Sequence, residues 1–338
     1  MGMNPDNKQG LVRTRLGRTE LEVSEISLGC WTLGGPNWNQ GSPVGWGDLD
    51  EDEAVRAVEL ALDLGVNHFD TADVYGNGRS ERLLGRVIGS RRKELVLATK
   101  VGWFSGTAEH AYCPLNIRHQ IEQSLENLNT DYVDIYYFHH GDFGPGDRYL
   151  DDAVEVMRNL RREGKVRFIG QSAYTQEDFE KLIPKVDPDV LQGSAHMLNL
   201  KMIGPDSRVA KMILERDLGF VAFSPMAQGL LLDKYSADNP PVFPEGDNRR
   251  RSIWFKEDFL RLMEPKLAAL KQRFGPNTAD LVRASLQYLL SYPAVSCVIP
   301  GFRNREQVEM NLGAAGRPVS EEDARWVYGL FADLAKVA

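Results

Sequence analysis

Cysteine is scarce in this chain, and its scarcity argues against two kinds of site. The 338 residues include three cysteines, Cys30, Cys113 and Cys297, and no two of them form a C-x-x-C pair. Neither a disulfide framework nor a thiolate zinc site is expected, and this usage is typical of a reducing compartment. The first 20 residues are polar and lack the apolar centre of a secretory signal. We therefore expect a cytoplasmic protein.

Long apolar runs and an excess of positive charge are also missing. No apolar run reaches the roughly 20 residues that a membrane-spanning helix needs. The net charge is −8, with 40 Lys and Arg against 48 Asp and Glu, whereas nucleic-acid-binding proteins usually carry a basic patch. The densest basic cluster, residues 249–251, lies in a loop and is large enough only for a small anion. We expect neither a membrane nor a nucleic-acid partner, and leave a homo-oligomer open.

A glycine-rich dinucleotide fingerprint is missing as well. Residues 76–81 begin like G-x-G-x-x-G, but the last position is Glu81. The strand expected before this stretch ends in an acid, Asp70, so the stretch does not fit a phosphate-binding turn. We expect its two glycines to make a tight turn and Ser80 to cap the helix that follows.

Strands and helices alternate along the chain, and this alternation predicts the fold. A β-hairpin is expected first, over residues 12–16 and 21–23 around a glycine turn. Eight strand–helix units follow, at the spacing of parallel βαβ crossovers. Eight such units favour a closed (β/α)8 TIM barrel, an α/β fold, with extra helices at its C-terminal end. We expect a disordered start over residues 1–10 and a single barrel domain over residues 11–338.

Two long loops, residues 34–49 and 237–252, interrupt the alternation, and loops of this length are more often functional than idle. The second is expected to be a lid over the mouth of the barrel.

The expected strands cover residues 26–29, 66–69, 95–99, 133–138, 167–170, 190–192, 220–223 and 296–299. The expected helices cover residues 51–64, 80–88, 116–128, 150–162, 176–183, 207–215, 256–274, 278–290, 304–312 and 321–335.

Polar residues stand at the ends of three successive expected strands. Asp70, Lys100 and His139 each follow an apolar run, and Tyr75 comes five residues after Asp70. Catalytic groups of (β/α)8 barrels gather at the carboxyl ends of the strands. We therefore expect these four side chains to meet at one mouth.

This combination of residues is suited to proton transfer to a carbonyl oxygen. A tyrosine has a pKa near 10, and an ammonium about 4 Å away, at an effective dielectric near 20, lowers it by up to about three units. Lys100 is the candidate cation for Tyr75, and Asp70 compensates its burial. His139 can donate a hydrogen bond to the carbonyl oxygen. Because no side chain supplies a hydride, a nicotinamide cofactor is implied.

Other uses of the same residues fit the pattern less well. A structural role is the commoner explanation for any one of them, but four such groups on three neighbouring strand ends are a rarer coincidence. A metal site is not expected, because one carboxylate and the adjacent pair His139 and His140 lack the usual ligand spacing. A Schiff base on Lys100, as in an unrelated (β/α)8 aldolase, is an alternative that borohydride trapping would reveal.

Six stretches of the chain together resemble the aldo-keto reductases of the bacterial type. The resemblance runs in order from about residue 12 to the C-terminus, and it implies a (β/α)8 barrel that binds NADP(H) without a Rossmann domain. It places the catalytic tetrad of that family on Asp70, Tyr75, Lys100 and His139. The matching stretches are residues 69–76, 98–100, 131–139, 164–170, 224–231 and 299–311.

The resemblance also implies where the cofactor lies. Ser172 and Gln192 match the groups that hold the nicotinamide carboxamide, and Phe223 replaces the aromatic residue, usually tyrosine, that stacks on the nicotinamide. Arg303 is placed to meet a 2′-phosphate, so NADPH/NADP+ is the expected cofactor and NADH the alternative. The implied cofactor-binding residues are Trp31, Asp70, Ser172, Gln192, Phe223, Ser224, Pro225, Met226, Gln228, Gly229, Leu230, Pro300, Gly301, Arg303, Gln307 and Asn311.

The chain departs from that family at two cofactor positions. Ala173 stands where the family usually has asparagine, which removes one hydrogen bond to the carboxamide. Gln307 stands where many NADPH-specific members have arginine, which weakens the preference for NADPH over NADH.

Aromatic residues at the expected mouth are candidates for binding substrate. The expected reaction is the NADP(H)-dependent reduction of a small aldehyde or ketone, sugar-like or aromatic, to an alcohol, with Tyr75 as general acid. The alternatives are an NAD(P)-dependent sugar or alcohol dehydrogenase on the same fold, and a nicotinamide-binding regulatory subunit. Trp31, Trp103 and His140 are the expected substrate contacts, and Trp38, Trp46 and Phe104 are further candidates from the long loops.

Overall fold

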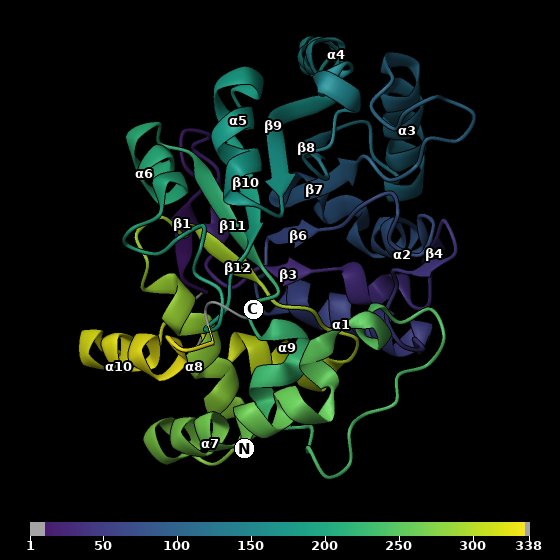
Figure 1. Cartoon of the computed structure of the whole chain (residues 1–338). Helices are drawn as coiled ribbons and strands as arrows, with labels where there is room; N and C mark the ends of the chain where they lie inside the picture. Colours follow the sequence, from purple (N-terminus) through teal and green to yellow (C-terminus); the bar gives the residue numbers. More distant parts are fainter. Residues whose placement is uncertain (1–10, 335–338) are drawn as a thin grey trace.

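A barrel of eight parallel strands lies at the centre of the structure, a computed structural model that describes residues 11–334 (Figure 1). The strands are hydrogen-bonded in the order β12-β11-β10-β9-β8-β7-β6-β3. The barrel is closed between β3 and β12, where Ile26 bridges Val298 and Gly29 bridges Gly301. The expected (β/α)8 barrel, with its N-terminal hairpin and additional C-terminal helices, is confirmed.

The barrel strands are β3 (Leu28–Gly29), β6 (His68–Asp70), β7 (Val96–Val101), β8 (Val133–Phe138), β9 (Val166–Ala173), β10 (Val190–Ser194), β11 (Gly219–Phe223) and β12 (Cys297–Ile299). The helices are α1 (Glu51–Asp63), α2 (Arg79–Ile88), α3 (Pro114–Leu128), α4 (Leu150–Arg162), α5 (Gln176–Val186), α6 (Arg208–Glu215), α7 (Glu257–Phe274), α8 (Thr278–Leu290), α9 (Arg305–Leu312) and α10 (Glu321–Phe331). Two antiparallel pairs lie outside the barrel: β1 (Arg13–Arg15) with β2 (Glu22–Ser24), and β4 (Trp38–Asn39) with β5 (Ser42–Pro43). Within residues 11–334, no helix is both long enough and apolar enough to cross a membrane.

Strand side chains alternate between two apolar regions, as the period of two in a strand requires. Those that point outward pack against the surrounding helices in one large buried cluster. Those that point inward fill the barrel with a smaller cluster that includes Ala98, Ile135, Val190 and Val221. Asp70 and Lys100 are also buried, so polar groups stand at the carboxyl end of an otherwise largely apolar interior.

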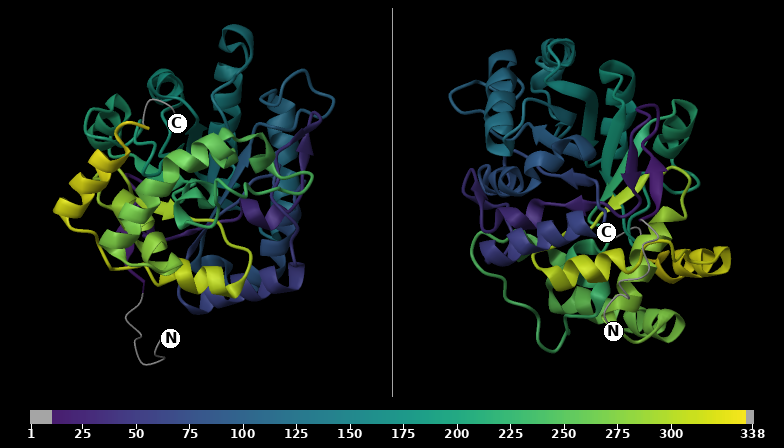
Figure 2. Two further views of the ribbon diagram at one scale, coloured as in Figure 1. Left: turned by 60° about the horizontal axis from the view of Figure 1, so that its bottom comes forward. Right: turned by 180° about the vertical axis from the view of Figure 1, so that it is seen from behind.

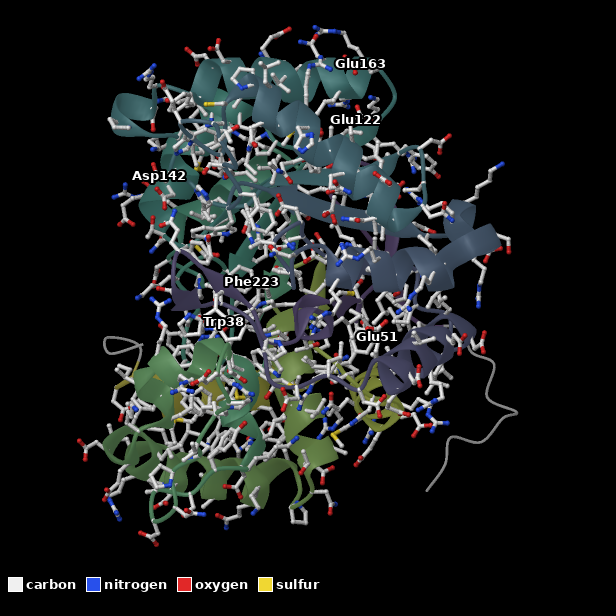
Figure 3. All side chains as sticks on the ribbon, turned by 90° about the vertical axis from the view of Figure 1, so that its right-hand side faces the viewer. Trp38, Glu51, Glu122, Asp142, Glu163 and Phe223 are labelled. Atoms are coloured by element: carbon white, nitrogen blue, oxygen red, sulfur yellow. The ribbon has the colours of Figure 1, made fainter. Side chains whose placement is uncertain are left out.

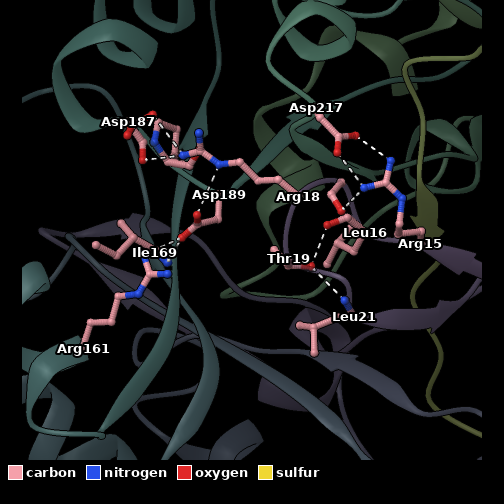
Figure 4. A network of polar contacts seen from close by, with 12 residues as sticks. Arg15, Leu16, Arg18, Thr19, Leu21, Arg161, Ile169, Asp187, Asp189 and Asp217 are labelled. Atoms are coloured by element: carbon pink, nitrogen blue, oxygen red, sulfur yellow. Dashed lines mark hydrogen bonds and ion pairs between the residues drawn. The ribbon is translucent and has the colours of Figure 1, made fainter.

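The hairpin β1–β2 covers the amino-terminal end of the barrel. Arg15 donates two hydrogen bonds to the carboxylate of Asp217, at 2.6 and 2.7 Å, just before β11. Arg18 pairs with Asp189, just before β10 (Figure 4). Leu16, at the hairpin, belongs to the apolar cluster inside the barrel. The hairpin, seen from behind in Figure 2, therefore closes the base and leaves the carboxyl end for a functional site.

Two loops meet over the carboxyl end of the barrel. The loop after β3 contains the small hairpin β4–β5, which the sequence did not indicate. This loop pairs with the loop between β11 and α7, because Gly45 bridges Asp247 and donates a backbone hydrogen bond to Gly246 at 3.0 Å. Figure 3 labels Trp38 on β4 and Phe223 at the end of β11. The predicted lid, residues 237–252, is thus attached to the other long loop.

Most predicted elements lie within a few residues of the observed ones, and the exceptions have local causes. Strand β9 runs on to Ala173 because its pairing with β8 and β10 continues past Gly170. The prediction that Ser80 caps α2 is wrong: Gly78 precedes the helix, and the buried Ser80 hydroxyl donates to Cys30 O. Helix α10 ends at Phe331 rather than at residue 335. The expected disordered start, residues 1–10, lies outside the described residues, and the single domain stays a prediction.

Candidate active site

The register of the strands brings Asp70 and Lys100 together at the carboxyl end of the barrel. Asp70 ends β6 opposite Ala98, two residues before Lys100 on β7. The Lys100 Nζ donates to Asp70 Oδ1 at 2.5 Å, to Thr71 O at 2.7 Å and to the Tyr75 hydroxyl at 3.2 Å. An ammonium has three donors, so all of them are used and the side chain is fixed.

A tight turn after β6 directs Tyr75 to the same place. The Tyr75 N–H donates to Ala72 O at 3.1 Å. Gly76 follows with φ of +62°, and a Cβ there would lie 2.2 Å from Gly34 O, so only glycine fits. The turn holds the phenol ring with its centroid 4.8 Å from the Lys100 Nζ.

Aromatic rings flank the phenol. The His139 ring lies 5.8 Å from the Tyr75 ring, centroid to centroid. Trp31 lies 6.4 Å from Tyr75, and Trp103 lies 6.0 Å from His139. The Trp31 Nε1 donates to Val44 O at 2.9 Å, which fixes that ring. The predicted tetrad is thus brought together, with two of the expected substrate contacts on either side of Tyr75 and His139.

Burial decides the protonation states of these groups. It raises the pKa of Tyr75 well above its usual value, and the Asp70 carboxylate adds to that rise. It lowers the pKa of His139 well below its usual range, and the Lys100 ammonium adds to that fall. At neutral pH Tyr75 is therefore a phenol and His139 a neutral imidazole. The expected lowering of the Tyr75 pKa is not seen, because desolvation of the phenol and the nearby Asp70 carboxylate both raise it.

Most of the residues predicted to bind a cofactor line one cavity of about 580 Å³. The cavity begins at Tyr75, His139 and Trp103 and continues past the ends of β9, β10 and β11 to the start of α9. The predicted cofactor residues along its wall are Trp31, Asp70, Ser172, Gln192, Phe223, Ser224, Pro225, Met226, Gln228, Gly229, Gly301, Arg303, Gln307 and Asn311.

Some predicted site residues do not line this cavity, among them Lys100, which lies beneath Tyr75, and the further candidates Trp38 and Phe104. Leu230 is buried among apolar side chains, and Pro300 is absent from the wall. His140 bonds through Nε2 to Gly102 O at 2.7 Å and accepts through Nδ1 from Asp142 N at 3.2 Å. Both ring nitrogens of His140 are thus occupied by backbone, and its ring lies 4.6 Å from that of Trp103. His140 therefore supports Trp103 rather than facing the cavity, which corrects its assignment as a substrate contact.

Gln192 makes a contact that the sequence did not indicate. Its Nε2 donates to Asp70 Oδ2 at 2.7 Å, while Lys100 occupies the other carboxylate oxygen. Burial raises the pKa of Asp70, and the Lys100 ammonium and the Gln192 amide oppose the rise. Asp70 thus has both oxygens bound, one by a cation and one by a neutral donor.

The far end of the cavity is positively charged. The guanidinium of Arg303 donates to Asp48 O at 3.1 Å, and within residues 11–334 it forms no ion pair. Burial and the nearby Arg249 both lower the pKa of Arg303. Arg249 is already bound to Asp247 and lies over the Trp46 ring. Arg303 is therefore a cation with donors to spare, as an anionic ligand requires.

Several lining residues were missed or only weakly indicated by the sequence. Tyr174 follows the expected Ser172 and faces Phe223, with ring centroids 6.2 Å apart. Tyr174 could have been predicted to line the cavity, because it lies just past the carboxyl end of an expected strand. The basic run at residues 249–251 was noted only as a possible anion site. The missed lining residues include Asn39, Val44, Tyr174, Lys234, Tyr235, Arg249 and Arg251.

Two alternative chemistries find no support in this geometry. A Schiff base needs a free amine, but the Lys100 Nζ is buried and all three of its donors are bound. A metal site needs converging ligands, and no cluster of three or more His, Cys, Asp or Glu suited to a metal occurs in the described part of the chain. A nicotinamide cofactor fits better, because the buried Gln228 Oε1 has no partner along the cavity and Arg303 keeps donors beyond the one bound to Asp48 O.

Several known proteins resemble this chain over nearly its whole length. An uncharacterized oxidoreductase of Bacillus subtilis, YqkF, is 28% identical over 93% of this chain and 94% of its own length. The NADH-specific methylglyoxal reductase of Escherichia coli is 26% identical over 91% and 95%. The holo form of the aldo-keto reductase AKR11C1 from Bacillus halodurans superposes with a TM-score of 0.72 at 26% identity, covering 97% of each chain.

A family profile also matches most of the chain. The profile described as "Aldo/keto reductase family" matches residues 25–328. This range includes the barrel strands, the Asp70–Lys100–Tyr75 contacts and the charged end of the cavity. The chain belongs to the aldo/keto reductase family, and it is one of the NAD(P)H-dependent oxidoreductases of that family.

Proposed function

We propose that this protein reduces a small aldehyde or ketone to an alcohol with NADPH, with Tyr75 as general acid. The observation that carries the proposal is the contact of the Tyr75 hydroxyl with the Lys100 Nζ, at 3.2 Å, while Asp70 holds the same ammonium. A bound nicotinamide supplies the hydride. Because burial raises the pKa of Tyr75, the phenol holds its proton at neutral pH, which favours reduction over oxidation.

Each side chain of the mouth has a role in moving that proton. Tyr75 donates it from the hydroxyl to the carbonyl oxygen of the substrate. The Lys100 ammonium stabilises the phenolate that is left, and the neutral His139 donates a hydrogen bond that orients the carbonyl. Trp31 and Trp103 form the walls against which an aromatic or sugar-like substrate packs, and they exclude water from the reacting atoms.

The cofactor preference depends on the charged end of the cavity. Arg303 has free donors and no carboxylate partner in the part of the chain that the structure describes, which suits a 2′-phosphate. Gln307 accepts from the Arg303 backbone N–H at 2.8 Å, so its side chain stabilises the turn that carries Arg303. These contacts favour NADPH, although the E. coli relative is named as NADH-specific.

Tyr75→Phe tests the general acid. Turnover of a panel of benzaldehyde, methylglyoxal and glyceraldehyde with NADPH should fall at least about 10²-fold, the usual range for a general acid. The affinity for NADPH, followed by quenching of tryptophan fluorescence, should stay within about twofold of wild type. Tyr174→Phe, the same change at another phenol of the cavity, is the matched control. Activity retained in Tyr75→Phe would remove Tyr75 as the acid, and a wild type that binds neither NADPH nor NADH would overturn the function itself.

Arg303→Ala tests the cofactor. We expect NADPH to bind about 10- to 100-fold more weakly, because charge-assisted hydrogen bonds contribute roughly 1.5–3 kcal/mol. NADH has no 2′-phosphate, so its affinity should change little. Arg305→Ala is the control, since Arg305 is absent from the cavity wall and pairs with Glu53 on the surface. Equal losses for NADPH and NADH would contradict a 2′-phosphate site at Arg303.

A further inference from the structure

Glu81, in the first turn of α2, is fully buried, and the proposed chemistry does not use it. Its Oε1 accepts a hydrogen bond from the Thr99 hydroxyl on β7 at 2.7 Å, and its Oε2 accepts one from Asn127 Nδ2 on α3 at 2.9 Å. Within residues 11–334 it forms no ion pair. One carboxyl group thus joins three elements, α2, β7 and α3, through neutral donors.

Stability alone does not explain a buried acid that no cation accompanies. Burial raises the pKa of Glu81, and the hydrogen bonds from Asn127 and Thr99 oppose that rise. Removing a carboxyl group from water is costly, and an apolar side chain of similar size would avoid the cost. A carboxylate accepts with both oxygens, whereas a glutamine has a single acceptor atom. The acid therefore fixes α2 against β7 and α3 at the same time.

Strand β7 presents Thr99 and Lys100 on its two faces, because neighbouring side chains of a strand point in opposite directions. Ala98 belongs to the apolar cluster inside the barrel, and Leu97 to the cluster outside it. Lys100 therefore points inward to the mouth, and Thr99 points outward to α2. The bond to Glu81 holds the outer face of the strand whose inner face carries the ammonium.

The turn that carries Tyr75 leads directly into the helix that Glu81 anchors. The Ser80 N–H donates to Tyr75 O at 3.2 Å, and the Gly78 N–H donates to Asp73 O at 2.9 Å. The turn and the first residues of α2 are therefore one hydrogen-bonded unit. A backbone bond from this turn to β7, from the Asp73 N–H to Lys100 O, is long, at 3.3 Å. The bond of 2.7 Å through the side chain of Glu81 is much shorter.

We propose that Glu81 and Thr99 are positioning residues for proton transfer: their hydrogen bond holds α2, and with it Tyr75, at the distance from Lys100 that a general acid requires. The inference rests on the proposed role of Tyr75. The contacts form a closed ring, from the Lys100 Nζ to the Tyr75 hydroxyl at 3.2 Å, through the turn to Glu81, and back to β7 at Thr99. The contact of 3.2 Å is at the long end of the hydrogen-bond range. A small shift of α2 away from β7 therefore breaks it.

Thr99→Val tests the proposal, because valine has nearly the shape of threonine and lacks the hydroxyl. The readout is the reduction of whichever panel aldehyde wild type reduces fastest. We expect kcat to fall by about 10- to 100-fold, as a small misplacement of a catalytic group does. The KM for the aldehyde and the affinity for NADPH should stay within about twofold of wild type. Thr99→Ser keeps the hydroxyl and should restore most of kcat.

Thr19→Val is the matched control. Thr19 is also buried, and its hydroxyl donates to Leu16 O at 2.6 Å in the hairpin at the amino-terminal end of the barrel (Figure 4). This variant should lower the melting temperature and leave kcat unchanged, because its lost bond is remote from Tyr75. A purely structural role for Thr99 would give the same result as this control.

Glu81→Asp tests the other partner of the bond. Aspartate keeps the carboxyl group but is one methylene too short to reach Thr99, so kcat should fall as in Thr99→Val. Wild-type kcat in Thr99→Val or in Glu81→Asp, an equal fall in Thr19→Val, or no recovery in Thr99→Ser would overturn the proposal. Failure of the proposed function would be seen separately, as activity retained in Tyr75→Phe.

Discussion

At the scale of single residues, the site is organised around one ammonium whose partners are all fixed. The Lys100 Nζ has three donors and three bound acceptors, two of them from the turn that follows β6. A lysine held in this way cannot act as a free amine. Its Nζ is held 3.2 Å from the Tyr75 hydroxyl, where a positive charge would stabilise a phenolate.

Lys100→Met removes that charge and should shift the pH dependence of oxidation. Oxidation requires Tyr75 to accept a proton, so its rate rises as pH passes the pKa of the phenol. Burial and the Asp70 carboxylate already raise that pKa, and without the ammonium it rises further. The half-maximum should therefore move to higher pH by at least about one unit, and reduction should slow. Lys93→Met, at an exposed position, is the control, and an unchanged profile in Lys100→Met would mean that Lys100 does not act on Tyr75.

The sequence predicted which residues meet at the mouth but not every contact among them. Asp70, Lys100 and His139 were predicted because each follows an apolar strand, and parallel strands end at one edge. The bond from Gln192 to Asp70 was not predicted, because it depends on how an amide turns within the barrel. His140 was assigned to substrate on its position alone, whereas its two backbone bonds are set by neighbouring loops.

At the scale of elements, hydrophobic periodicity predicted the strands and helices of the barrel. Elements that depend on pairing with a distant segment of the chain were not predicted. Strand β8 and helices α4 and α8 have the predicted bounds. The pair β4–β5 was not predicted, because strands of two residues carry no periodic pattern. Their loop is ordered instead by bonds to a distant segment, through Gly45 and Gly246.

Besides these backbone bonds, the side chain of Arg249 connects the two long loops. Arg249 is bound to Asp247 within its own loop, and its guanidinium carbon lies 4.0 Å from the Trp46 ring and 4.1 Å from the Phe243 ring. Trp46 belongs to the loop after β3, and its ring lies 5.2 Å from that of Trp31. A chain of contacts therefore runs from the covering loops to the wall of the proposed substrate site.

At the scale of the whole molecule, the barrel closes at a narrow seam beside the cavity. Strand β3 has two residues and meets β12 through two isolated bridges. The Gly29 N–H donates to Pro300 O at 3.0 Å, and Gly29 also lines the cavity. Gly29 thus belongs both to the seam that closes the barrel and to the cavity wall, which the sequence of β3 alone did not reveal.

Gly29→Ala tests this dependence, because a Cβ at Gly29 would lie 2.8 Å from Ile299 O on the facing strand. Overpacking of this kind costs about 1–3 kcal/mol, so the melting temperature should fall by about 2–6 °C. The seam should also widen beside the cavity, and NADPH should bind more weakly. Gly329→Ala is the control, since Gly329 lies on α10 with nothing within 4 Å of an added Cβ; it should raise stability by about 0.5–1 kcal/mol. If Gly29→Ala melted like wild type and kept full NADPH affinity, the seam would not be the point at which closure and binding are coupled.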